Sequence, residues 1–95
     1  MSKKSQREKE VHRLVALGRP VSSIRKDTDE SGREYHIAAT LRKVGDQYHV
    51  LIDLYYPIGT TGETIREEGK AFRDLEEAVG YLEEVSVIPI FMLKA

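Results

Sequence analysis

Apolar and polar residues alternate in two runs on either side of residues 44–47, and this alternation is the strongest structural signal in the chain. A two-residue loop at Gly45 and Asp46 would join the runs as a β-hairpin, because glycine readily adopts the positive φ of such a turn. Pairing across this loop collects the apolar side chains on one face: Ile37, Ala39, Leu41, Val50, Ile52 and Leu54. Since a slip of one residue would mix the faces, the pattern predicts a central hairpin over residues 35–56.

Two helical patterns flank this hairpin. Residues 5–17 place a short apolar stripe on one side and end at Gly18, which is typical of a helix terminus. Residues 74–85 begin with a capping box at Asp74 and Glu77 and carry a longer stripe, so this helix should pack on the apolar face of the hairpin. Residues 1–4 are expected to form a mobile basic tail.

Two further segments favour strands beside the hairpin. Residues 63–72 extend it, and continuing its register brings Glu67 beside Ile52. We therefore expect a β-bulge or an early end to the strand pairing near residues 67–69. Residues 21–26 can form an edge strand, although Val21 and Ile24 fall on opposite faces.

The last apolar segment, residues 87–93, is apolar on both sides, which predicts a C-terminal strand that is covered on both sides or meets another chain. Together these elements predict one α+β domain over residues 1–95. Its antiparallel sheet has three or four strands, with the N-terminal helix, the helix at about 74–85 on one sheet face and the C-terminal apolar strand.

Composition and charge narrow the classes of function. The chain has no cysteine, which excludes disulfides, thiol nucleophiles and cysteine-ligated zinc.

The charges are unevenly distributed along the chain. Residues 1–26 carry eight basic and two acidic side chains, a net charge of +6, whereas the remaining residues carry a net charge of −7. Such a basic segment can contact an anionic partner or lie on its own acidic body. No apolar stretch follows the basic N-terminus, so we expect a cytoplasmic protein that does not enter a membrane.

Two groups of residues resemble metal sites, but neither has the full set of ligands at a suitable spacing. Asp27, Asp29 and Ser31 match the opening of an EF-hand loop, but the twelfth position is Ala38 in place of the required glutamate. His36 and His49 would lie about 20 Å apart along the hairpin, too far to share a metal. We therefore expect no metal, no cofactor and no enzymatic activity.

Three groups of residues remain as candidate sites. The polar hairpin face carries a candidate interaction face of His36, Arg42, His49, Asp53 and Tyr55. The apolar tail offers candidate self-association residues: Val87, Ile88, Ile90, Phe91 and Leu93. The basic segment offers candidate phosphate contacts: Lys3, Lys4, Arg7, Lys9 and Arg13.

The sequence thus favours a small non-enzymatic module that binds a protein partner or a second copy of itself, through the tail or the sheet edge. A two-sided apolar tail in so small a chain is the reason. The alternative is a nucleic-acid-binding protein that uses the basic N-terminal segment.

Overall fold

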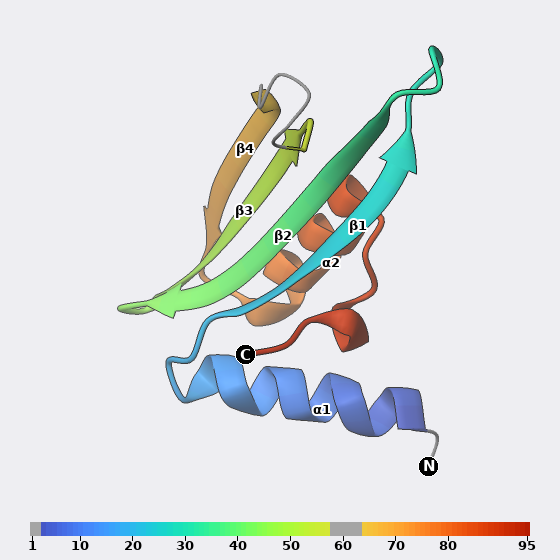
Figure 1. The fold of residues 1–95 in the computed structure, drawn as a ribbon. Helices are drawn as coiled ribbons and strands as arrows, with labels where there is room; N and C mark the ends of the chain where they lie inside the picture. Colours follow the sequence, from blue (N-terminus) through green and yellow to red (C-terminus); the bar gives the residue numbers. More distant parts are fainter. Residues whose placement is uncertain (1–2, 58–63) are drawn as a thin grey trace.

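The sheet and its two helices form an α+β fold, as the sequence predicts. The computed structural model describes the backbone of residues 3–57 and 64–95, and side chains from Ser5 onward within these ranges. Its elements are α1 (Lys3–Ala16), β1 (Val21–Thr28), β2 (Glu34–Val44), β3 (Gln47–Tyr55), β4 (Thr64–Phe72), α2 (Leu75–Ser86) and the 3-10 turn η1 (Ile90–Met92). The strands form one antiparallel sheet in the order β1-β2-β3-β4, with α2 behind it and α1 below one end (Figure 1).

The central hairpin has the predicted register. Leu41 pairs with Val50 and Ile37 with Leu54, and the turn residue Gly45 has a φ of 63°. A two-residue loop with positive φ at its first position matches the right-handed twist of the flanking strands. The predicted register is therefore confirmed. Alternation specifies it because neighbouring side chains of a strand point to opposite faces, and a shift of one residue would move every apolar side chain to the wrong face.

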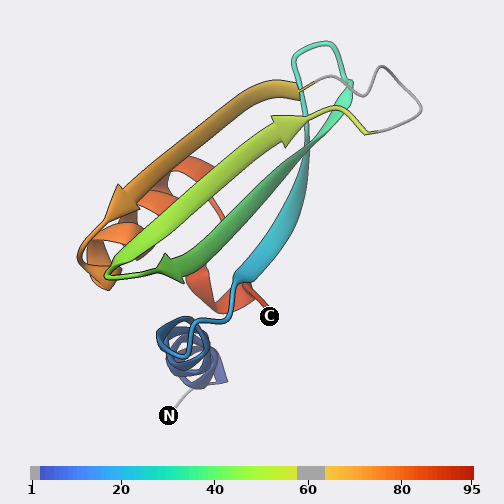
Figure 2. The same cartoon turned by 90° about the vertical axis from the view of Figure 1, so that its left-hand side faces the viewer.

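The apolar face of the hairpin carries the core of the domain. Ile37, Ala39, Leu41, Val50 and Ile52 are at most 4% exposed, and together with α1, α2 and the C-terminal tail they form one hydrophobic cluster. The helix α2 lies against this face of the sheet (Figure 2). We call it the covered face.

The start of α2 follows from its capping residue. Asp74 has extended backbone angles, and its carboxylate accepts a hydrogen bond of 3.2 Å from the Glu77 backbone N–H. This bond satisfies one of the orphan donors of the first turn. Ala78 and Leu82 then fall on the buried side of the helix.

The predicted C-terminal strand is wrong. After α2 the chain makes the turn η1, and within the described tail only Lys94 pairs with a strand, through an isolated bridge to Ser22 at the outer edge of β1. Two backbone hydrogen bonds form this bridge, Ser22 N–H to Lys94 O at 2.8 Å and Lys94 N–H to Ser22 O at 2.9 Å. The tail cannot continue as a strand because its apolar residues turn inward to cover α1.

The predicted self-association residues of the tail differ in their exposure. Ile88 and Ile90 are 3% exposed and Leu93 is fully buried, all within the core cluster of their own chain. Val87 is 64% exposed, and Phe91 is partly buried. Part of the two-sided apolar pattern is therefore explained inside the domain, where η1 packs against α1 and α2. Self-association through the tail stays a prediction.

Two smaller expectations about the strands have different outcomes. The strand predicted at residues 21–26 is confirmed as β1, with Val21 buried and Ile24 exposed on the opposite face. The predicted register of β4 is wrong by one residue, because Glu68 lies opposite Ile52 and Glu67 opposite Asp53. The pairing becomes irregular between Leu54 and Tyr55 of β3, which lie opposite Arg66 and Thr64 of β4. This position precedes the predicted bulge at residues 67–69.

The helix α1 begins at Lys3, so the backbone of residues 3 and 4 is helical. The expected mobility of residues 1–4 stays a prediction. Val11, Leu14 and Val15 bury the apolar side of α1. Within the described part of the chain, no helix is long and apolar enough to cross a membrane.

Candidate interaction surface

The sheet has a second face that neither α1 nor α2 covers, and Figure 1 views the molecule from this side. The pairing of the four strands arranges its residues in rows. The rows are Lys26, His36, Tyr55 and Thr64; Ile24, Ala38, Asp53 and Glu67; Ser22, Thr40, Leu51 and Gly69; and Arg42, His49 and Ala71. We call these residues the open face. All five candidate interaction residues named from the sequence lie on it.

The acidic residues of the open face lie side by side. Asp53 on β3 is directly opposite Glu67 on β4, and like charges in such a pair destabilise a sheet. Asp53 is partly buried, and its Oδ1 atom is a buried oxygen to which no described residue donates a hydrogen bond. A buried carboxylate oxygen without a donor costs free energy, and the like charge of Glu67 adds to that cost.

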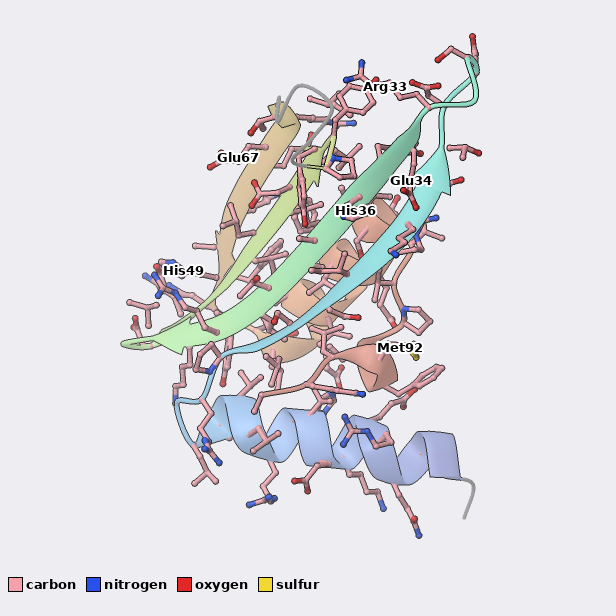
Figure 3. The ribbon with its side chains drawn as sticks, in the orientation of Figure 1. Arg33, Glu34, His36, His49, Glu67 and Met92 are labelled. Atoms are coloured by element: carbon pink, nitrogen blue, oxygen red, sulfur yellow. The ribbon has the colours of Figure 1, made fainter. Side chains whose placement is uncertain are left out.

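A basic row lies on the other side of Leu51. Arg42 on β2 pairs with His49 on β3. Figure 3 shows His49 near the hairpin turn and away from Glu67. They line a hollow of about 580 Å³ whose other walls include Thr40, Leu51 and Ala71. The small side chains of β4 leave this hollow open, because Gly69 has no side chain next to Leu51.

One exposed apolar side chain lies between these charged rows. Leu51 on the inner strand β3 is 40% exposed, and Ile24, which is 59% exposed, lies on the edge strand β1 in the same row as Asp53. An exposed apolar residue with polar residues around it is a common feature of protein interfaces.

The far end of the open face carries an aromatic pair. His36 and Tyr55 are cross-strand partners whose rings meet edge to face with centroids 5.5 Å apart. Both are partly buried, and Figure 3 shows His36 on the near side of β2. The pair therefore presents a rigid aromatic edge rather than two independent side chains.

Sequence reasoning missed three residues of the open face. Leu51 is its central apolar residue, Ile24 is an exposed apolar residue of the edge strand β1, and Glu67 is half of its acidic pair, yet the candidate residues all came from the hairpin. The sequence of β4 could have identified Glu67. If Phe72 is placed on the apolar face of the sheet, the alternation of side chains puts Glu67 on the open face. The structure shows Phe72 opposite Tyr48 and packed against the core.

The candidate phosphate contacts lie elsewhere, on α1 below the end of the sheet (Figure 1). Arg7 donates a hydrogen bond of 3.0 Å from Nη2 to the Leu93 carbonyl, and Arg13 forms a salt bridge of 2.6 Å with Glu10. The side chains of Lys3 and Lys4 are outside the described part. Arg7 and Arg13 thus already have structural contacts within the chain.

The loop that resembles an EF-hand opening is organised by one carboxylate. Asp29 Oδ1 accepts hydrogen bonds from the backbone N–H groups of Ser31 and Arg33, each at 2.9 Å, and Oδ2 accepts one from the Tyr56 hydroxyl at 3.0 Å. Together with the Ser31 hydroxyl, these donors lower the pKa of Asp29 to about 2. Among the described residues, no three His, Asp or Glu side chains lie close enough together to hold a metal ion.

Comparison with known proteins identified no relative of this chain. No protein-family model matches the chain, and neither a curated protein nor a solved structure is significantly similar to it.

Proposed function

We propose that this chain is a small non-enzymatic interaction module that recognises a protein surface with the open face of its sheet. The observation that carries the proposal is the acidic pair of Asp53 and Glu67, which lowers the stability of the isolated chain and holds an oxygen without a donor among the described residues. Such a pair is useful when a partner places a cation beside the exposed residue Glu67, because the opposite charge then offsets the repulsion between the two carboxylates.

The composition of the surface supports a protein partner over a nucleic acid. The open face carries Lys26 and Arg42 against Asp53 and Glu67, so its fixed charges cancel. A nucleic-acid surface needs an excess of positive charge, which supplies most of the affinity for phosphates. The basic alternative rests on α1, where Arg7 and Arg13 already bond within the chain.

The test is capture of partners from a lysate on the immobilised chain, before and after nuclease treatment. Leu51→Asp places a charge at the centre of the open face, and Leu17→Asp makes the same change at a leucine of 64% exposure beyond the end of α1. We expect captured protein that survives nuclease, persists with Leu17→Asp and is lost with Leu51→Asp.

Either of two results would contradict this proposal. Capture that disappears with nuclease would assign the chain to nucleic-acid binding through its basic segment. Capture that is equal for the two aspartate variants would show that binding does not use the open face. Circular dichroism of both variants confirms that each remains folded.

A further inference from the structure

We infer that the open face binds a second copy of the same chain, around a two-fold axis that crosses the face above Leu51 and runs perpendicular to the strands. This inference rests on the proposed function and names its partner. In a two-fold interface the same patch serves both copies, so every residue must find its complement on that same patch.

The charges of the open face meet this requirement. Along β3, His49 precedes Leu51 by two residues and Asp53 follows it by two, so both side chains lie about 7 Å from the leucine on the same face. Their neighbours have the matching signs, because Arg42 pairs with His49 and Glu67 with Asp53. Rotation about an axis above Leu51 therefore sets each basic row over the acidic row of the other copy.

The direction of the axis follows from the same rows. An axis parallel to the strands would place Asp53 against Asp53 of the partner subunit and leave the repulsion uncorrected. An axis across the strands instead places His49 against Asp53 of the partner subunit, with Leu51 against the partner's Leu51. It also keeps the strands of the two sheets nearly aligned, which is the common packing of two sheets face to face.

The hollow provides room for this contact. It is lined by Arg42 and His49, beside Leu51, where the acidic row of the second copy would arrive. Gly69 and Ala71 of β4 also line the hollow, and their small size leaves space on the β4 side. A carboxylate that enters there gains a basic side chain that offsets the repulsion from its like-charged neighbour.

The competing surfaces for self-association are weaker. Three apolar residues of the tail, Ile88, Ile90 and Leu93, are buried in their own chain, and Lys94 pairs with the outer edge of β1 at Ser22. The outer edge of β4 carries the charged residues Arg66, Glu68 and Lys70, and charges at an edge oppose the addition of another strand.

The size of the surface indicates a weak dimer. Four strands about 4.8 Å apart and about eight residues long give a flat area of about 500 Å² per copy. Two such areas lie at the low end of specific interfaces, where association is transient. We therefore expect dissociation in the micromolar range and a monomer of 10.8 kDa on dilution.

Sedimentation equilibrium of the full chain with two charge variants tests the arrangement. His49→Glu creates two repulsive contacts in its homodimer, and so does Asp53→Lys, so each alone should weaken association by about tenfold or more. A mixture of the two variants should associate again. In the mixed dimer the lysine introduced at position 53 of one copy meets the glutamate introduced at position 49 of the other, while the second contact keeps the native His49 and Asp53.

Because Asp53 is partly buried, a second pairing guards against misfolding. Glu67→Lys alters an exposed residue of the same row and should also be rescued by His49→Glu. Leu17→Asp, outside the face, should associate like the native chain.

Rescue in the mixtures supports the two-fold arrangement. A monomer at all concentrations up to millimolar overturns the inference, and so does association that neither charge variant changes. These results leave the proposed function standing if Leu51→Asp still abolishes capture of a different protein. If Leu51→Asp changes neither capture nor sedimentation, both the inference and the proposed function fail.

Discussion

The two faces of the sheet are built from alternate residues of the same strands, yet they follow different rules. Ile52 on the covered face is fully buried, while its neighbour Leu51 on the open face is 40% exposed. The covered face contains apolar side chains that stabilise the fold. The open face contains an acidic pair and a carboxylate oxygen that has no donor among the described residues, and these do not stabilise it. The difference shows which residues the fold needs and which ones call for a functional explanation.

The largest expected contrast comes from alanine substitutions at adjacent residues. Ile52→Ala should lower the free energy of unfolding by about 2–5 kcal/mol, because it removes a side chain from a close-packed core. Leu51→Ala should cost less than about 1 kcal/mol, since its side chain is already partly in water. Urea denaturation at concentrations where the chain is monomeric measures both values. Equal losses would mean that the open face is also part of the folding core.

A second prediction concerns the end of α2, behind the covered face. The Ser86 hydroxyl is buried; it donates to Leu82 O at 2.5 Å and accepts from the Ile88 backbone N–H at 3.1 Å. Ser86→Ala should lower the free energy of unfolding by about 1–3 kcal/mol, because it leaves the Ile88 N–H buried without this acceptor. Thermal unfolding measures the loss, and Ser86→Thr, which keeps the hydroxyl, should lose less. A neutral Ser86→Ala variant would contradict the role of this hydroxyl in holding the tail.

The residue after Ser86 should respond in the opposite direction. Val87 has a φ of 56°, a left-handed conformation that is unfavourable for a β-branched residue, and its N–H caps α2 through Glu83 O. Val87→Gly should raise the free energy of unfolding by about 1 kcal/mol, because glycine adopts this φ without strain. Val87→Ala keeps a Cβ and should gain less. A loss of stability with glycine would instead show that the exposed valine side chain makes a stabilising contact.

On the open face, removing a charge should stabilise the isolated chain. Asp53→Asn eliminates the repulsion with Glu67 and should raise the free energy of unfolding by about 0.5 kcal/mol. Glu67→Gln should have a similar effect, and the double variant should gain little more, because either change removes the same repulsion. Chemical denaturation of the monomer measures all three. A loss of stability in the single variants would mean that the pair is already satisfied within the chain.

The smallest effect on stability is expected in the loop between β1 and β2, which Asp29 holds together through its hydrogen bonds. Its pKa is lowered from 3.8 to about 2 in the folded chain. A lowered pKa means that the ionised carboxylate contributes stability above about pH 4, and this contribution is lost as the pH falls toward 2. Thermal unfolding between about pH 5 and pH 2 should show this loss in the native chain and a smaller one in Asp29→Asn. An identical pH dependence in both would remove Asp29 as its source.

Local sequence patterns were reliable where the partners are close along the chain. The hairpin register follows from Gly45 and the period of two, and the start of α2 follows from the capping residue Asp74. The same local alternation placed the five candidate interaction residues on one face. It failed at β4, because residues 64–72 alternate weakly and their register depends on how Phe72 packs in the core.

The sequence by itself determined the hairpin, the two helices and the separation of an apolar face from a polar one, because each depends on neighbours within a few residues. Only the tertiary structure decided which surface remains uncovered. The apolar tail looked like an interface until Ile90 and Leu93 were placed in the core, with Arg7 of α1 bonded to the Leu93 carbonyl from the other end of the chain. Burial of that kind depends on contacts between distant segments, which no local pattern records.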